Sequence, residues 1–296
     1  MSTQTSPRPL RVAIVGTGNI GTDLLLKVAA SPLLTCTLFA GRRAGSPGIE
    51  LADSHGVPTS TDGIDAVTAR VEDIDLVFDA TSANDATHHW SLVAPTGLPF
   101  VDLTPAHLGK FCVPALNLDD CLDEQYLSMV TCGGQAAVPM AHCMAEAAAG
   151  IDYLEIVSAS ASASVGPASR ANLDEYVHTT EQATTEFCGV RRTKTVLVIN
   201  PADPGIVMRN SIAVSAAEGI DLDALRASVS MMEKLIMSYV PGYRVVVPPV
   251  AAGDRVTIMV EVEGRGDWFP RYAGNLDIIT CAGLAVAEAR AERWRA

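Results

Sequence analysis

The feature that most constrains the fold is a glycine pattern that follows an apolar run near the N-terminus. Residues 10–15 are mostly apolar, as in a strand covered on both faces. The chain then passes through a Gly-x-Gly-x-x-Gly turn into a helical pattern, which predicts the phosphate-binding turn of a dinucleotide-binding fold. The glycines allow a tight turn, approach of a pyrophosphate and close packing of helix on strand. We therefore expect a nucleotide cofactor at Gly16, Thr17, Gly18, Asn19, Ile20 and Gly21.

The rest of the chain divides into two patterns. Up to about residue 131, strand patterns alternate with helical ones, which predicts an α/β architecture with a Rossmann-type, doubly wound parallel sheet. Beyond this point we expect a long helix at about 136–149, a small-residue loop at 158–169, a helix at 172–187 and antiparallel strands that include 255–263. We predict a dinucleotide-binding domain at 1–131 and a mixed α/β domain at 132–275. The helical segment 276–296 should pack back on the first domain.

Composition narrows the classes of function. A chain of 296 residues is long enough for two lobes, and a net charge of -13 disfavours general nucleic-acid binding. The first nine residues lack the apolar core of a signal peptide, and no segment is apolar for the roughly 20 residues of a membrane span. We therefore expect a cytoplasmic protein without a membrane segment. Seven cysteines without a Cys-x-x-Cys pair favour reduced thiols, with neither disulfides nor a metal site.

The end of the second predicted strand bears on the choice of cofactor. An acidic residue is expected there to hold a ribose 2′-hydroxyl, but the chain has Gly41, Arg42 and Arg43. Arg42 could instead pair with a 2′-phosphate, so NADP stays open beside NAD. The segments 79–83 and 102–105 follow later strands at the same sheet edge. Their simplest interpretation is turn and cap chemistry, with Thr81, Ser82 and Ala83 as further candidates for cofactor contact.

Cys132 is the candidate nucleophile. It follows an apolar strand pattern and precedes Gly133, Gly134 and a helix rich in alanine and methionine. At a helix N-terminus the dipole and free N–H groups should lower the thiol pKa, and the same N–H groups could hold an oxyanion. Cys143 is interpreted as ordinary packing. A thiol beside a nicotinamide suggests addition to an aldehyde, hydride transfer and a thioester, whose acceptor could be CoA, water or phosphate.

Ordered blocks along most of the chain resemble one family, the acylating acetaldehyde dehydrogenases that work with 4-hydroxy-2-oxovalerate aldolases in aromatic and steroid degradation. The matching blocks are residues 12–24, 77–83, 102–106, 129–136, 166–167, 169–172, 200–202, 239–243 and 272–278. The resemblance implies an NAD-dependent enzyme with a short aldehyde (acetaldehyde or propanal) and CoA as substrates. It also implies a homodimer formed through the second, catalytic domain, for which the segment 255–263 could serve as an edge strand, and a complex with an aldolase.

The resemblance also assigns roles to particular residues. It implies that Cys132 carries the acyl group and that residues 17–20 bind NAD. Further cofactor contacts are implied for one loop and for the residue directly before the last predicted helix: Ser164, Val165, Gly166, Pro167, Ala168, Ser169, Arg170, Ala171, Asn172 and Asn275. Without the resemblance, Asn275 reads as a helix N-cap.

One departure from the family pattern concerns activation of the thiol. The family has Met-Arg-Asp where this chain has Met208, Arg209 and Asn210. An amide cannot accept a proton at neutral pH, so Asn210 can only orient a partner, and the loss of a general base typically costs about 100-fold to 10,000-fold in rate. This departure motivates one alternative, a weakly active subunit that binds and regulates an aldolase. A separate alternative is a phosphorylating or hydrolytic semialdehyde dehydrogenase of related fold.

Overall fold

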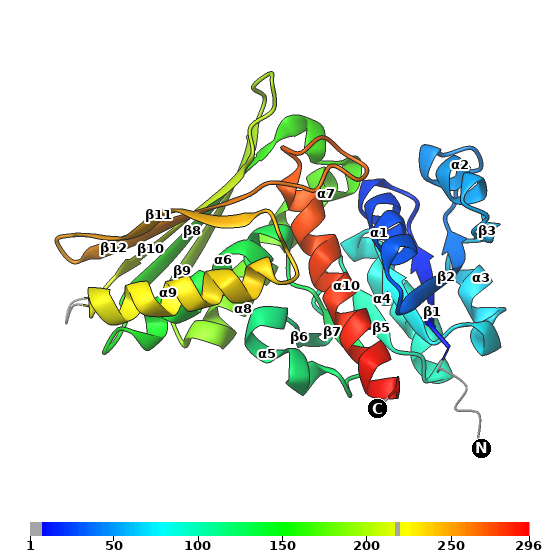
Figure 1. The fold of residues 1–296 in the computed structure, drawn as a ribbon, viewed down its shortest axis with the longest axis horizontal. Coiled ribbons are helices and arrows are strands. Elements are labelled where there is room, and N and C mark those ends of the chain that lie inside the picture. Colours follow the sequence, from blue (N-terminus) through cyan, green and yellow to red (C-terminus); the bar gives the residue numbers. More distant parts are fainter. Residues whose placement is uncertain (1–7, 217–219, 296) are drawn as a thin grey trace, which may run out of the picture.

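The first lobe is built around a parallel sheet. The computed structural model describes residues 8–216 and 220–295. Seven strands lie in the order β3-β2-β1-β4-β5-β7-β6, and each neighbouring pair is parallel. Strand order reverses at β1, whose neighbours are β2 and β4, so the expected doubly wound sheet is confirmed (Figure 1). The strands are β1 (Leu10–Val15), β2 (Leu34–Ala40), β3 (Thr59–Ser60), β4 (Leu76–Asp79), β5 (Phe100–Asp102), β6 (Lys110–Phe111) and β7 (Tyr126–Ser128).

Helices cover both faces of this sheet, which explains why its strands are apolar throughout. Val12 and Ile14 of β1 pack with one set of helices, whereas Ala13 and Val15 pack with another. The first set is α1 (Asn19–Ala30), α2 (Pro47–Ser54), α5 (Pro114–Cys121) and α10 (Gly274–Arg295). The second is α3 (Ile64–Thr68) and α4 (Ala83–Val93). Short 3-10 turns lie at Val71–Asp73, Ala94–Thr96 and Ser162–Ser164.

The second lobe has a five-stranded sheet in the order β11-β12-β10-β8-β9. Only β8 and β9 are parallel, and the other pairs are antiparallel, as expected for a mixed sheet. The strands are β8 (Tyr153–Ala161), β9 (Thr193–Asn200), β10 (Met208–Ser215), β11 (Tyr243–Ala252) and β12 (Arg255–Val262). Its helices are α6 (Cys132–Glu146), α7 (Pro167–Ala171), α8 (Leu173–Cys188) and α9 (Leu222–Met237), and α6, α8 and α9 contact one face of the sheet (Figure 1).

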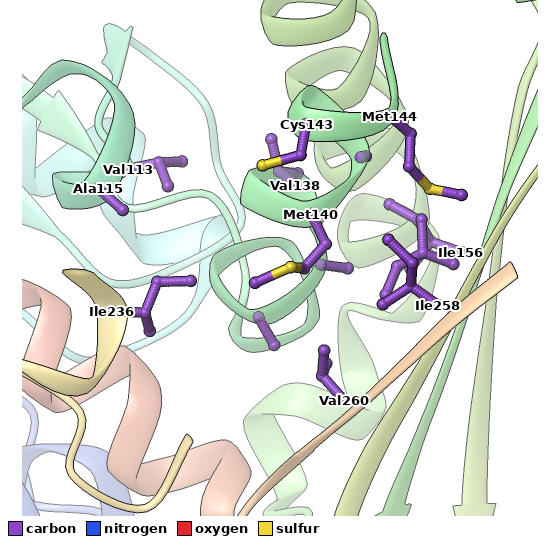
Figure 2. Packing of buried hydrophobic residues seen from close by; sticks show 14 of the residues in the cluster. Val113, Ala115, Val138, Met140, Cys143, Met144, Ile156, Ile236, Ile258 and Val260 are labelled. Carbon is purple, nitrogen blue, oxygen red and sulfur yellow. The ribbon is translucent and has the colours of Figure 1, made fainter. Parts of the chain in front are cut away.

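Helix α6 forms the centre of the second core. Its side chains Met140, Cys143 and Met144 lie among apolar residues of the sheet and of neighbouring helices (Figure 2). Ile156 comes from β8, and Ile258 comes from β12. Cys143 is 1% exposed, which confirms its interpretation as ordinary packing.

Three expectations about local structure were wrong. The segment 158–169 is not all loop, because β8 continues to Ala161 and α7 begins at Pro167. The long helix begins four residues earlier than expected, at Cys132, because Thr131 caps it. Residues 255–263 do not form an edge, since β12 lies between β11 and β10, and the edges of this sheet are β11 and β9. The hairpin partner β11 covers the side of β12 that was expected to be free.

Helix α10 returns to the first lobe, where a buried ion cluster joins it to α1. Lys27 of α1 is fully buried, and its Nζ lies 2.6 Å from Asp23, 2.8 Å from Asp277 and 3.4 Å from Asp267. Burial acts to lower the pKa of Lys27, but the carboxylates of Asp23 and Asp277 outweigh it and hold this pKa well above its ordinary value. The three carboxylates lie close enough together to bind a metal ion, but Lys27 supplies the positive charge among them. Across the described ranges 8–216 and 220–295, no helix is both long and apolar enough to cross a membrane.

Replacing Lys27 tests this cluster. Lys27→Met leaves Asp23 and Asp277 buried without their cation, so we expect the free energy of unfolding to fall by about 3–5 kcal/mol. Urea denaturation measures the change. The control is Lys194→Met, because the Lys194 side chain is 55% exposed and reaches Glu181 only at 3.8 Å. Equal losses in the two variants would show that the cluster does not stabilise the packing of α10 on α1.

Candidate active site

A pocket of about 770 Å³, part of it open to solvent, lies where the carboxyl ends of the first sheet meet the second lobe. This edge of a doubly wound sheet is where ligands of such folds bind. Of the candidate residues from the sequence, nine line the pocket: Ile20, Thr81, Ser82, Cys132, Val165, Ala168, Ser169, Asn172 and Asn275. Its other lining residues are Ala80, Leu103, Thr104, Pro105, Val130, Thr131, Ser160, Tyr176, Leu197, Leu276 and Ile279.

The glycine turn has the geometry that a bound pyrophosphate needs. Gly16 has a φ of +109°, and a Cβ there would lie 2.5 Å from the carbonyl oxygen of Ala80. A Cβ on Gly21 would lie 1.7 Å from the carbonyl oxygen of Gly16, so the helix approaches the turn closely. At Gly18, by contrast, a Cβ would meet no atom within 4 Å, and Gly18 is the N-cap residue of α1, which has no side-chain cap. The open space and the free N–H groups fit the phosphates of a dinucleotide.

The turns after β4 and β5 show the expected cap chemistry. Asp79 accepts hydrogen bonds from the backbone N–H and the hydroxyl of Thr81, and Asp102 accepts one from the N–H of Thr104. Ser82 caps α4 by accepting from the N–H of Asp85. Burial and the nearby Asp79 raise the pKa of Asp102 to about 7. Both aspartates therefore shape the turns, and the residues that follow them line the pocket.

Arg42 lies outside the pocket lining. Its guanidinium pairs with the carboxylate of Asp85 at 3.1 and 3.3 Å, and its side chain is 74% exposed. The pair joins the turn after β2 to the first turn of α4. At this exposure it contributes about 0–1 kcal/mol.

The backbone places the Cys132 thiol at the pocket. Val130, a β-branched residue, has a φ of +60°, in the left-handed region that such residues rarely adopt. This turn reorients the chain between β7 and α6. Thr131 then caps the helix by accepting from the N–H of Gly134 at 2.9 Å, and the side-chain amide of Gln135 donates to the carbonyl oxygens of Cys112 and Met129. The predicted helix start at Cys132 is present, but Gly133 and Gly134 belong to the first turn of α6 and do not form a separate turn before it.

The pKa of the thiol departs from the sequence-based expectation. Burial raises the pKa of Cys132 to about 11, although the Tyr176 hydroxyl and the N–H groups of Gly133 and Cys132 act to lower it. The expected net lowering was wrong, because the helix terminus lies in an apolar pocket. Among the described residues that line this pocket, none is an Asp, Glu, His, Lys or Arg. No charged side chain of the lining offsets the loss of hydration.

The sequence analysis missed the side chains nearest to the thiol. The Tyr176 hydroxyl lies 3.9 Å from the Cys132 sulfur. Ser158 hydrogen-bonds Tyr176 and donates to Oδ1 of Asn210. Asn210 therefore does not line the pocket but reaches the thiol through two hydroxyl groups. The sequence did contain a signal for Tyr176: it follows the candidate residue Asn172 by four positions, and residues four apart share a helix face. Tyr176 could therefore have been predicted to face the same pocket as Asn172.

Asn275 holds the loop that closes one side of the pocket. Its Oδ1 accepts from the Ser164 hydroxyl at 2.7 Å, and its Nδ2 donates to the Ser164 carbonyl oxygen at 3.2 Å. Helix α10 begins one residue earlier, at Gly274, so Asn275 is not an N-cap. Arg170 donates to the carbonyl oxygens of Val165 and Ser162, which orders the loop internally. The other candidates do not line the pocket: Gly16, Thr17, Gly18, Asn19, Gly21, Ala83, Ser164, Gly166, Pro167, Arg170 and Ala171.

The raised pKa predicts how Cys132 reacts with pH in the cofactor-free protein. The thiolate is the reactive form, so its alkylation by iodoacetamide should be slow at pH 8 and should rise about tenfold per pH unit toward a midpoint near 11. Peptide mass spectrometry follows Cys132 separately from the other cysteines. A midpoint near or below pH 8.5, the ordinary value of a free cysteine, would contradict the dominance of burial.

Comparison with known proteins finds a matching family for each of the two lobes. Residues 11–121 match the family described as "Semialdehyde dehydrogenase, NAD binding domain", and residues 132–270 match "Prokaryotic acetaldehyde dehydrogenase, dimerisation". The chain is 78% identical to "Acetaldehyde dehydrogenase 2" of Salinispora arenicola (strain CNS-205), over 98% of each chain. It is 49% identical to "Acetaldehyde dehydrogenase" of Spirochaeta aurantia and to that of Burkholderia pseudomallei (strain 668), over 95% of this chain and 94% of each relative. On this similarity along nearly its whole length, the protein belongs to the acetaldehyde dehydrogenase family of NAD-dependent oxidoreductases.

Proposed function

We propose that the protein is a CoA-acylating aldehyde dehydrogenase, which converts a short aldehyde, CoA and NAD to an acyl-CoA and NADH. Acetaldehyde and propanal are the substrates that we favour. One observation carries the proposal: the Cys132 thiol lies in the same pocket as Ile20 of the phosphate-binding turn and Thr81 and Ser82 of the neighbouring turn. A nucleophile and a nicotinamide site in one pocket suit oxidation of an aldehyde through a thioester.

The chain's own residues supply nucleophilic attack and charge stabilisation. The Cys132 thiolate adds to the aldehyde carbon, and the carbonyl oxygen becomes an oxyanion. The backbone N–H groups of Cys132 and Gly133, which act to lower the pKa of the thiol, lie at the helix terminus where an oxyanion would be stabilised. The turn at residues 16–21, with Thr81, Ser82 and the loop that Asn275 holds, would bind NAD. When bound, NAD accepts the hydride that leaves the former aldehyde carbon and so turns the adduct into a thioester.

The uncharged lining favours CoA as the acyl acceptor. Hydrolysis needs a general base to activate water, and a phosphorylating enzyme needs a cationic phosphate site. The described lining residues offer neither His, Asp or Glu for the first role nor Lys or Arg for the second. A thiol is more acidic and more nucleophilic than water, so CoA can lose its thiol proton to solvent and attack the thioester without a strong base. Cys132 then leaves as the thiolate.

Two alternatives are less well supported. A weakly active regulatory subunit would not need a thiol, a phosphate-binding turn and a shared pocket, all of which this chain has. For NADP, Arg42 would have to exchange Asp85 for a 2′-phosphate, and the carboxylate of Asp85 would repel that phosphate. We therefore propose NAD as the working cofactor and Arg42 as a residue at the rim of its adenosine site.

The assay for this function compares two cysteines. Wild-type protein with a short aldehyde and NAD should form NADH in a CoA-dependent manner, and Cys132→Ser should lower kcat by about a thousandfold or more. Cys188→Ser is the control, because Cys188 is a partly buried cysteine at the end of α8, outside the pocket. NADH formation that depends on phosphate rather than CoA, or no formation with any short aldehyde, would contradict the proposal.

We also propose a homodimer formed through the face of the second sheet that α6, α8 and α9 do not contact. Leu154, Ile156 and Ser158 of β8 are buried, so the alternate residue Val157 faces the other way. Its neighbours in the sheet are Val196, Ser211 and, beyond Ser211, Met259. Val196 and Val198 are 37% and 40% exposed in the single chain, as expected of an apolar face that a partner covers.

A charge on this face should separate the two copies. For Val196→Asp we expect sedimentation velocity to show a monomer, because a dimer would bury an unpaired carboxylate. Met231→Asp is the matched control: Met231 is 67% exposed but lies on α9, which packs against the opposite face. A wild-type monomer, or a Val196→Asp dimer of unchanged stability, would contradict the proposed interface.

An aldolase partner is a further proposal, and it rests on the family resemblance. Coexpression with a 4-hydroxy-2-oxovalerate-type aldolase tests it: a stable complex of the two chains on gel filtration supports it, and separate elution contradicts it.

A further inference from the structure

A chain of polar groups leads from the Cys132 thiol into the second sheet. The Tyr176 hydroxyl of α8 lies 3.9 Å from the sulfur, Ser158 of β8 hydrogen-bonds Tyr176, and Ser158 donates to Oδ1 of Asn210 on β10. Ser158 and Asn210 are direct partners in the antiparallel pairing of β8 and β10. Gly133 allows the approach, because a Cβ there would lie 2.0 Å from the Tyr176 hydroxyl and 2.5 Å from the Ser158 hydroxyl.

The side chains of Tyr176, Ser158 and Asn210 are buried, and one of their polar atoms has no hydrogen-bond partner. Ser158 and Asn210 are 0% exposed, and Tyr176 is 8% exposed. Within the described part of the protein, the Nδ2 group of Asn210 has no hydrogen-bond partner. An unpaired buried donor typically costs about 1–3 kcal/mol. A second arrangement of the chain would use this donor.

Each hydroxyl group in this row of side chains has one proton, so the direction of every hydrogen bond can be assigned. Ser158 donates its proton to Asn210 Oδ1, so it can only accept from Tyr176, and Tyr176 can then only accept from the thiol. This order stabilises a neutral thiol. If the Asn210 amide turns over, Nδ2 donates to Ser158, Ser158 donates to Tyr176, and Tyr176 donates to the sulfur. The reversed order stabilises a thiolate, and an ionised carboxylate at position 210 could not start it, because it only accepts.

We propose that Tyr176 is a positioning residue for the Cys132 nucleophile: its hydroxyl group donates a hydrogen bond to the thiolate when the Ser158 and Asn210 side chains reverse their hydrogen bonds. The thiol proton leaves to solvent, and the two hydroxyl groups only rotate, so no other bond to hydrogen breaks. The groups facing the Tyr176 hydroxyl are Cys132 and Thr131 from α6 and Ser158 from β8, and none of them is a charged group. The hydrogen bond from Tyr176 is thus the side-chain contact that favours the thiolate.

The test is the alkylation of Cys132 by iodoacetamide in the cofactor-free protein at pH 8 to 9, followed by peptide mass spectrometry. Well below the midpoint the rate is proportional to the thiolate fraction. Tyr176→Phe removes one hydrogen bond to a charged group, so we expect the rate to fall about tenfold or more and the pH profile to move upward. An unchanged rate and profile would overturn the proposal.

The control is Tyr243→Phe. The Tyr243 hydroxyl is buried and donates to the carbonyl oxygen of Ala136 on the same helix, at 2.7 Å, but does not contact the thiol. Removing this hydroxyl should lower the free energy of unfolding about as much as Tyr176→Phe does. The pH profile of Cys132 alkylation should stay unchanged. Equal shifts in both variants would show a general loosening of α6 and would also overturn the proposal.

The proposal rests on the proposed function, since it concerns the nucleophile of that reaction, but the two can fail separately. Alkylation is measured without aldehyde, CoA or NAD. If the wild-type protein forms no NADH while Tyr176→Phe still slows alkylation, the proposed function fails and the role of Tyr176 in thiolate formation stands. In the active enzyme, Tyr176→Phe should lower kcat more than it raises the KM for NAD, because Tyr176 acts on the thiol.

Discussion

The start of helix α6 at Cys132 is the constraint on which the rest of the structure depends. Thr131 caps this helix directly after the left-handed turn at Val130, so the first sheet leads into the central helix of the second core within a few residues. The same helix carries Cys132, the proposed nucleophile, at one end and packs Met140 and Met144 against the second sheet further along (Figure 2). Because these features share one helix, the position of the thiol depends on the packing of both lobes.

The pocket around this helix terminus has low polarity because its described lining contains no charged side chain. Its described lining consists of apolar, hydroxyl, thiol and amide side chains. Two groups of charged side chains in the first lobe, the Lys27 cluster and the Arg42–Asp85 pair, lie outside this lining. Low polarity makes the thiolate costly to form, and it also excludes the side chains that would activate water. The proposed selectivity for a thiol acceptor and the high pKa of the Cys132 thiol therefore have the same physical origin.

Several features were predictable because they are local. The strand, glycine turn and helix at 10–30 lie within one short segment, and the close contact of Gly21 with Gly16 spans five residues. The alternation of elements in the first lobe has the same local basis. Errors occurred where neighbours in space decide the outcome: β12 became an inner strand because β11 folds back beside it, and β8 extends to Ala161 because β9 pairs with it along its whole length.

The sequence by itself determined the doubly wound lobe, the glycine turn between β1 and α1 and the identity of the thiol at a helix start. Only the tertiary structure decided what surrounds that thiol. Tyr176 is 44 residues from Cys132 along the chain, and Asn210 is 52 residues from Ser158, so no local pattern joins them. Their contact follows from the pairing of β8 with β10 and from the close packing of α6 and α8 at Gly133, which also make the pocket apolar enough to raise the pKa of the thiol.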